Sequence, residues 1–414
     1  MANSKIGLAI ALLGGALFAL SAPTSAAPDE ERLGKSSGYP VGTPETWFFD
    51  ERVRVGSFSH LDRIFPHATL KRAPIALPLP TAENPPVIRY AFQGQTLGIG
   101  DFLARQRVTG LLILKDGQII AEHYQYDRTA AHRLISQSMA KSITSLAVGF
   151  ALAEGKIRSL DDRAAAYVPE LTGTGYGETT LRNLLRMGSG IRFSELYDGK
   201  DDSRRLGMKR ATAGTVAALR EFSERDAPQG TRFHYATSET ITLLAVVRRA
   251  IGGSVSDYLT QRLWQPMGAE ADATWITGRV DGYENGGGRF NAVLRDYGRL
   301  GVLLANDGFI DGRQVIPKDY LLEATDWRKH AEAFRPGKAT SYFGYGYQFW
   351  TFPGEKRRFA LLGVYGQSIF VDPELKLVMV ITAVAQEALV GQGTLAGERS
   401  ALWRALIAAY EKKR

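Results

Sequence analysis

The sequence predicts an α+β fold in which an antiparallel sheet, built from both chain ends and flanked by helices, adjoins a mostly helical second subdomain. Strand patterns occur over residues 111–124 and return over residues 342–383. Helical periodicity dominates the stretch between them, at about residues 150–310. Since the two groups of strands stand at opposite ends of the chain, we expect them to meet in one sheet, with a cleft between that sheet and the helical layer.

Each element has its own local signal. An apolar run at residues 111–114, an Asp116–Gly117 turn and a second run at residues 118–124 predict a β-hairpin. Helix-period apolar positions predict helices over residues 138–154, 181–187, 240–251, 294–304 and 398–411. Strands are predicted over residues 342–352, 359–364, 368–371 and 377–383.

The N-terminal residues have the pattern of a secretory signal peptide. Lys5 precedes an apolar run over residues 6–20, and small residues follow at 24–27. An uncleaved membrane anchor is the alternative, but a span needs about 18 consecutive apolar residues and this run is shorter. We therefore predict a signal peptide at residues 1–26 and an exported protein, periplasmic or secreted, that has no stable membrane anchor after cleavage.

Residues 27–95 show no sustained periodicity but contain aromatic residues, Trp47 among them, and a proline-rich stretch at 74–86. Disordered segments are usually poor in aromatic residues. The pattern predicts an N-terminal extended arm packed on the main domain, which spans residues 96–414.

Composition excludes several classes of function. The chain has 414 residues, a formal net charge of +8 and no cysteine, so it forms no disulfide. Its Lys and Arg residues are scattered, and the dense runs at 356–358 and 412–414 lack interleaved aromatic residues, which argues against nucleic-acid binding. None of the six histidines stands in an H-E-x-x-H motif and no glycine-rich phosphate loop precedes a helix, so we expect neither a metal nor a cofactor. The oligomeric state stays open.

Ser138-Met139-Ala140-Lys141 is the strongest catalytic candidate. Residues three apart share a helix face, so Lys141 can reach the Ser138 hydroxyl where a predicted buried helix begins. The helix N-terminus offers free N–H groups to a developing oxyanion, and burial would lower the pKa of the lysine so that it acts as a base. The alternative is an N-cap serine followed by a solvated lysine.

Two further segments could complete a site. Tyr235, on a short extended segment ahead of a helix, could present its hydroxyl to the pair, although it could also be a packed aromatic residue. Residues 361–367 form a glycine-containing strand edge along which a substrate could add, placing Leu362 and Tyr365 as candidate substrate contacts. The alternative for this edge is a glycine-loosened hairpin corner.

At these places the chain resembles the serine β-lactamases and their relatives, the D-alanyl peptidases, class C-type esterases and 6-aminohexanoate-dimer (nylon oligomer) hydrolases. The resemblance extends from about residue 110 to 383 and implies a β-lactamase/transpeptidase-like fold. The runs that carry it, and that are most similar to the 6-aminohexanoate-dimer hydrolase branch, are residues 137–142, 184–190 and 363–367, together with the arm around Trp47.

The resemblance implies that Ser138 is acylated, that Lys141 and Tyr235 move protons, and that the N–H groups of Ser138 and Val364 form the oxyanion hole. It also places Tyr197 and Asn285 at substrate-binding positions, although both could be ordinary loop residues. Which of Lys141 and Tyr235 is the acylation base stays open.

Two departures from the family pattern bear on the substrate. Many relatives read Y-x-N where this chain has residues 235–237 as Tyr-Ala-Thr, and many read K-T-G where it has 361–363 as Leu-Leu-Gly. A β-lactam or D-alanyl carboxylate would lose a charged partner at the second position. We therefore predict a serine hydrolase that cleaves a small-molecule linear amide or carboxylic ester through an acyl-Ser138 intermediate. The alternatives are a β-lactamase or D-alanyl peptidase, and a non-hydrolysing ligand-binding protein.

Overall fold

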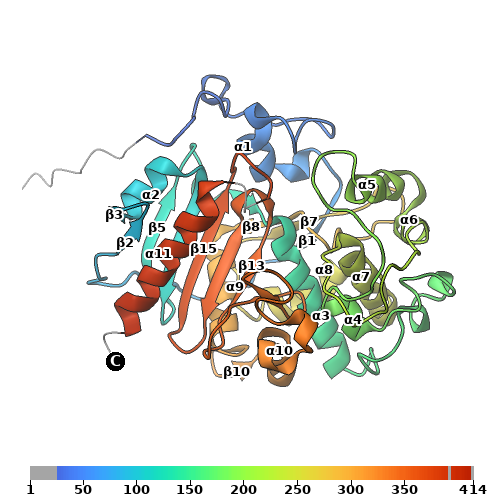
Figure 1. Cartoon of the computed structure of the whole chain (residues 1–414). Helices are drawn as coiled ribbons and strands as arrows, with labels where there is room; N and C mark the ends of the chain where they lie inside the picture. The colour runs from blue at the N-terminus through green and yellow to red at the C-terminus, as the bar shows by residue number, and fades with distance from the viewer. Residues whose placement is uncertain (1–25, 390–392, 412–414) are drawn as a thin grey trace, which may run out of the picture.

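The structure, a computed structural model, describes residues 26–389 and 393–411 (Figure 1). Its main sheet is antiparallel and has seven strands in the order β11-β12-β13-β14-β15-β4-β5. The N-terminal hairpin joins the C-terminal strands where β4 pairs with β15, with Leu112 opposite Val380. The predicted α+β sheet built from both chain ends is therefore confirmed. The strands of this sheet are β4 (Val108–Lys115), β5 (Gln118–Tyr124), β11 (Gly344–Tyr345), β12 (Trp350–Thr351), β13 (Phe359–Leu362), β14 (Ser368–Asp372) and β15 (Leu377–Ala383).

Side chains of alternate strand residues face opposite sides of this sheet. In β4, Leu111 and Ile113 pack with Trp403 of the C-terminal helix α11, whereas Leu112 and Leu114 belong to the larger core beneath helix α9. Figure 1 shows α11 lying across one face of the sheet. The helices are α1 (Glu51–Ser59), α2 (Ile99–Arg105), α3 (Ala140–Ala153), α4 (Leu181–Leu185), α5 (Asp202–Ala213), α6 (Thr215–Leu219), α7 (Thr237–Ile251), α8 (Val255–Leu259), α9 (Leu294–Ala305), α10 (Lys318–Thr325) and α11 (Thr394–Glu411).

A second antiparallel sheet, which the sequence did not predict, has four strands in the order β1-β7-β8-β6. It joins a segment near the N-terminus to the middle of the chain. Strand β6 leads through the 3-10 turn Gln137–Met139 into α3, and β8 leads directly into α9. Two further sheets have two strands each, β2 with β3 and β9 with β10. The remaining strands are β1 (His67–Leu70), β2 (Arg89–Phe92), β3 (Gln95–Gly98), β6 (Arg133–Ile135), β7 (Ala273–Ile276), β8 (Phe290–Val293), β9 (Phe309–Ile310) and β10 (Arg313–Gln314).

The structure corrects two local predictions. The arm is not extended throughout, because Asp50 caps α1 by accepting a hydrogen bond from the Arg52 N–H, and that helix is largely buried. The strand predicted over residues 342–352 is split into β11 and β12. Between them Gln348 adopts a φ of 63° and its buried side chain donates to the carbonyls of Leu184 and Leu185.

The predicted signal peptide lies almost wholly outside the described residues. The β2–β3 hairpin spans the boundary predicted between residues 95 and 96. Among the described helices, none has the length and apolar character needed to cross a membrane.

Candidate active site

Ser138 lies in a single 3-10 turn, Gln137–Met139, that leads directly into α3. The backbone before it is fixed from both sides: the Ser136 N–H donates to the Phe290 carbonyl at 2.7 Å, and Gln137 is held in the left-handed region at φ 45°. The side chain of Ser138 is half-buried at the edge of a cavity. A rigid helix start therefore presents the hydroxyl.

Lys141 lies one turn further along and is 1% exposed. Its Nζ is 2.9 Å from Ser138 Oγ, 2.9 Å from Thr237 Oγ1 and 2.7 Å from the Gly287 carbonyl oxygen. Burial lowers the pKa of Lys141 to about 8, against an opposing attraction to the Glu195 carboxylate. An appreciable fraction of this lysine is therefore neutral near pH 7.

The three contacts of Lys141 match the three N–H donors of its ammonium form, which donates to Ser138 Oγ, Thr237 Oγ1 and the Gly287 carbonyl. A neutral amine has two N–H donors and one lone pair. If Thr237 Oγ1 and the Gly287 carbonyl accept the two N–H groups, the lone pair is directed at the Ser138 hydroxyl. Loss of one proton from Lys141 would therefore leave its lone pair facing the Ser138 hydroxyl, in position to accept the serine proton.

Tyr235 precedes α7 and is stacked on Trp350, with ring centroids 5.6 Å apart and an interplanar angle of 21°. Lys141 Nζ lies 5.0 Å from the centroid of the tyrosine ring. Burial, and next the Glu195 carboxylate, raise the pKa of Tyr235 well above its usual value, while a hydrogen bond with Ser138 opposes the rise. The Tyr235 hydroxyl therefore stays protonated at neutral pH and can donate a proton.

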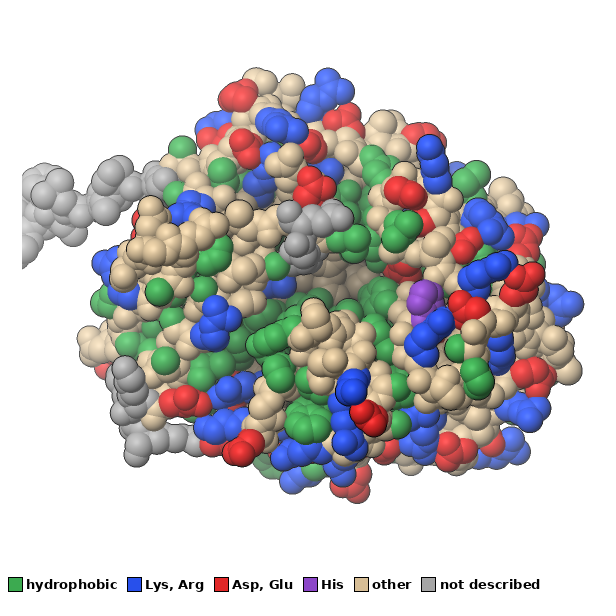
Figure 2. Space-filling view, viewed as in Figure 1, with side chains coloured by type: hydrophobic (Ala, Val, Ile, Leu, Met, Phe, Trp, Pro, Cys, Tyr) green, Lys and Arg blue, Asp and Glu red, His purple; other side chains and the backbone are tan. Residues whose placement is uncertain are grey.

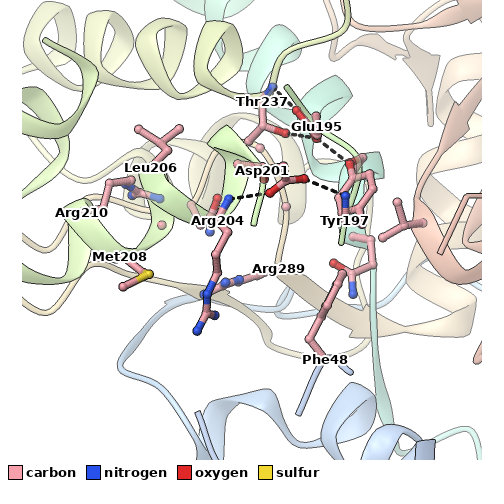
Figure 3. A pocket seen from close by; sticks show the side chains of 18 of the residues that line it. Phe48, Glu195, Tyr197, Asp201, Arg204, Leu206, Met208, Arg210, Thr237 and Arg289 are labelled. Carbon is pink, nitrogen blue, oxygen red and sulfur yellow. Dashed lines mark hydrogen bonds between the residues drawn. The ribbon is translucent and has the colours of Figure 1, made fainter. Parts of the chain in front are cut away.

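Glu195 joins Tyr197 to Thr237 at the start of α7 (Figure 3). Its carboxylate accepts hydrogen bonds from the Tyr197 hydroxyl at 2.5 Å, from Thr237 Oγ1 at 2.5 Å and from the Thr237 N–H at 2.6 Å. Burial raises the pKa of Tyr197 well above its usual value, and a hydrogen bond with Ser138 opposes this rise too. The loop that carries Tyr197 is held in turn by Asp201, which accepts from the N–H groups of Leu196 and Tyr197 at 2.7 Å each.

The end of β13 lies against the helix start. A Cβ placed on Gly363 would lie 2.6 Å from the Ser136 carbonyl oxygen and 3.0 Å from the Ser138 nitrogen, so only glycine permits this approach. The next residue, Val364, lines the same cavity as Ser138. Among the described residues, neither the Ser138 N–H nor the Val364 N–H has a backbone acceptor, which leaves both free to hold an oxyanion.

The other predicted contacts differ in position. Asn285 lines the cavity, and its carbonyl accepts from Trp275 Nε1 at 2.8 Å. Leu362 is the half-buried last residue of β13. The ring of Tyr365 is buried between Phe48 and Phe58, with the Arg54 guanidinium carbon 4.2 Å from its centroid. Contact of these residues with substrate stays a prediction.

The cavity beside Ser138 has a volume of about 310 Å³. It is lined by residues from the arm, from α5 and from the glycine run before β8. Figure 2 shows a hollow near the middle of the face, with hydrophobic side chains around it. The described residues contain no cluster of three or more His, Cys, Asp or Glu side chains able to hold a metal ion.

Sequence reasoning missed Glu195 and Thr237. Glu195 lies in the same short loop as Tyr197, and Thr237 lies where many serine β-lactamase relatives have asparagine. The hydrogen bond between them joins residues 42 positions apart, so no local pattern indicates it. Arg289, which also lines the cavity, was missed because an isolated arginine after a glycine run has no distinctive pattern.

A serine hydroxyl paired with a buried lysine at a helix start, beside a strand edge that supplies a second N–H, defines a serine hydrolase of the acyl-transfer class. The family model described as Beta-lactamase matches residues 99–392, and the chain belongs to this family. It is 27% identical over 337 residues to a 6-aminohexanoate-dimer hydrolase from Paenarthrobacter ureafaciens, which covers 78% of this chain and 83% of the relative.

Solved structures share the fold. A candidate 6-aminohexanoate-dimer hydrolase from Bacillus anthracis superposes with a TM-score of 0.78 at 22% identity, covering 88% of this chain and 96% of the other. A D-stereospecific amidohydrolase from Streptomyces sp. superposes with a TM-score of 0.53 at 17% identity, covering 70% of this chain and 93% of the other.

Proposed function

We propose that the protein cleaves a linear amide or carboxylic ester of a small molecule through an acyl-Ser138 intermediate. The observation that carries the proposal is the 2.9 Å contact between Ser138 Oγ and the buried Nζ of Lys141, whose pKa is lowered to about 8. The names of the relatives support the choice of bond, because one is a hydrolase of a linear amide, the 6-aminohexanoate dimer, and another is an amidohydrolase.

Acylation begins with neutral Lys141. Its lone pair takes the Ser138 proton as Oγ attacks the substrate carbonyl, and the oxyanion that forms accepts from the N–H groups of Ser138 and Val364. The bond to the leaving group then breaks. Tyr235, protonated because its pKa is raised, donates a proton to the leaving amine or alcohol and regains one from the Lys141 ammonium. An acyl-Ser138 ester and neutral Lys141 remain.

Deacylation repeats these steps with water as the nucleophile. Water gives a proton to Lys141 and attacks the ester carbonyl, and the Ser138 oxygen leaves and regains its proton. The sum is one amide or ester and one water converted to an acid and an amine or alcohol. The protein's own side chains supply every proton transfer.

Residue 361 bears on the choice between a linear substrate and a β-lactam. Leu361 is 1% exposed in the core of the sheet, at the position where many relatives have a lysine in K-T-G. The strand therefore offers no cation at that point to a substrate carboxylate, which favours a linear amide or ester over a β-lactam or D-alanyl peptide.

We also propose that the protein is exported after removal of residues 1–26. The support is the charged, apolar and small-residue pattern of that segment. Export would be measured as mature protein that begins near residue 27 and appears outside the cytoplasm.

The test is turnover by the chain that begins at residue 27 of three probes: a nitrophenyl ester, the linear 6-aminohexanoate dimer and a chromogenic β-lactam. Ser138→Ala removes the nucleophile. Ser400→Ala is the matched control, because the Ser400 hydroxyl donates to the Ala396 carbonyl within α11, far along the chain from the site residues.

Ester or amide cleavage that is lost in Ser138→Ala and kept in Ser400→Ala is the expected result. Activity that survives in Ser138→Ala would refute the acyl-serine mechanism. Cleavage of the β-lactam alone would select the β-lactamase alternative, and a stable stoichiometric adduct without product would identify a binding protein.

A further inference from the structure

We propose that the cavity beside Ser138 binds a carboxylate of the substrate through Arg289, assisted by Arg204. The proposal rests on the proposed hydrolase function and specifies its substrate class: a linear amide or ester that is anionic on the part held in this cavity.

Arg289 stands close to the reacting groups. The Gly287 carbonyl accepts from Lys141 Nζ at 2.7 Å, and Arg289 is two residues further along the same segment. Its α-carbon is thus at most about 7 Å from that of Gly287. Arg289 and Ser138 line the same cavity, so one substrate molecule could contact both.

Aromatic residues of the arm hold the Arg289 side chain. Its guanidinium carbon lies 4.9 Å from the Trp47 ring centroid and 5.3 Å from that of Phe65. These contacts fix the side chain but use none of its N–H donors. Within the described part of the chain, Arg289 makes no ion pair and no side-chain hydrogen bond, although it lines the cavity.

Other cations stand near Arg289. Arg204, on the exposed side of α5, likewise forms no ion pair with a described residue, and Arg210 is a buried arginine further along α5 (Figure 3). Burial, and next the repulsion from Arg210 and Arg204, lower the pKa of Arg289 to about 10. The guanidinium is still charged at neutral pH, so the cavity lining carries three arginines, of which Arg210 donates to Thr215 and to the Glu284 carbonyl.

Within the described residues, the cavity carboxylates Glu195 and Asp201 form no ion pair with Arg289 or Arg204, and their hydrogen bonds are made to hydroxyl and backbone N–H groups. Glu195 accepts from Tyr197 and Thr237. Asp201 accepts from three backbone N–H groups, those of Leu196, Tyr197 and Arg204. An incoming carboxylate would find free, planar N–H donors suited to a paired hydrogen bond, and an incoming ammonium would be repelled.

Two matched pairs of substrates test this charge preference. On the acyl side, the nitrophenyl ester of adipic acid, which keeps a free carboxylate, is compared with that of monomethyl adipate. On the amine side, hexanoyl-6-aminohexanoate is compared with N-hexylhexanamide. The measured quantity is the ratio of kcat/KM for the anionic member to that for the neutral member.

We expect wild-type protein to favour the anionic member of at least one pair by about 10-fold or more. Arg289→Met, which keeps an apolar stem, should lower that ratio by about 10- to 100-fold, and Arg289→Lys should restore part of it. Arg205→Met is the matched control on α5, because Arg205 pairs with Asp202 and stacks on Phe222. Ratios near one in both pairs, or ratios that Arg289→Met leaves unchanged, would overturn the proposal.

A binding measurement separates this proposal from the hydrolase mechanism. Calorimetric titration of Ser138→Ala with adipic acid monoamide, and with adipamide as the neutral control, reports the carboxylate site without turnover. Selective binding of the anion that is lost in Arg289→Met supports the site even if no ester is cleaved. If Arg289→Met does not fold, Arg204→Met carries the same test, because the exposed Arg204 side chain can be removed without opening the core.

Discussion

Glu195→Gln should shift the pH dependence of the reaction to lower pH. The Glu195 carboxylate favours the ammonium form of Lys141 and so raises the pKa of that lysine, against the larger effect of burial. Removing the negative charge should therefore lower the pKa of Lys141 below its present value of about 8. More of the lysine would be the neutral base at any given pH.

The size of the shift follows from the hydrogen-bond chain between the two groups. Lys141 Nζ is 2.9 Å from Thr237 Oγ1, which is 2.5 Å from a Glu195 oxygen. The two charges are thus about 5 Å apart, and at an effective dielectric constant of about 20 they attract by about 3 kcal/mol. That energy corresponds to about 2 pKa units, and solvent at the half-exposed Glu195 reduces it to about 1 to 2 units.

The assay is kcat/KM for the nitrophenyl ester from pH 5 to 10, because this parameter reports the ionisations of the free enzyme. Wild-type protein should rise with pH through a midpoint near 8, and Glu195→Gln through a midpoint about 1 to 2 units lower. Glu224→Gln is the control, because Glu224 pairs with Arg192 on the surface. A midpoint that stays in place or moves upward in Glu195→Gln would refute the assignment of Lys141 as the base.

Three further substitutions test the neighbouring contacts. Thr237→Val removes the acceptor of one Lys141 N–H and should lower kcat/KM by about 10- to 100-fold, with circular dichroism as the check on folding. Gly363→Ala places a Cβ 2.6 Å from the Ser136 carbonyl oxygen and should lower both kcat and the free energy of unfolding, the latter by about 1 to 3 kcal/mol in denaturant titrations. Glu239 is buried and its pKa is raised to about 8, so the folded state holds a proton that the unfolded chain releases at lower pH. Its contribution to stability is therefore lost as pH rises from about 4.5 to 8, and wild-type protein should lose stability relative to Glu239→Gln over that range; parallel curves would contradict this.

The parts of the fold that sequence predicted are those with a local signal. The hairpin of β4 and β5 combines an apolar run with an Asp116–Gly117 turn, and the strands β13 to β15 are themselves apolar runs. The second sheet had no such signal, because β1, β6, β7 and β8 have only three or four residues each, and β1 and β6 pair with strands far away along the chain. Helix α1 was missed because its buried face includes Arg54, Gly56 and serines rather than an apolar stripe.

In the site, too, the sequence predicts contacts within one element but not contacts between distant elements. Ser138 and Lys141 share one helical turn, so their contact follows from spacing alone. The contact of Thr237 with both Lys141 and Glu195 depends on how α3, α7 and a loop pack, and the stacking of Arg289 on Trp47 depends on where the arm crosses the domain. No period or motif in the sequence encodes these distances.

The most direct test of the central claim is to trap the acyl-enzyme. Wild-type protein is mixed with the nitrophenyl ester, quenched in acid within milliseconds, digested and analysed by mass spectrometry. The acyl-serine mechanism predicts that the acyl mass is carried by the peptide containing Ser138, and that Ser138→Ala shows neither the adduct nor turnover. An acyl group on another residue, or turnover by Ser138→Ala, would contradict it.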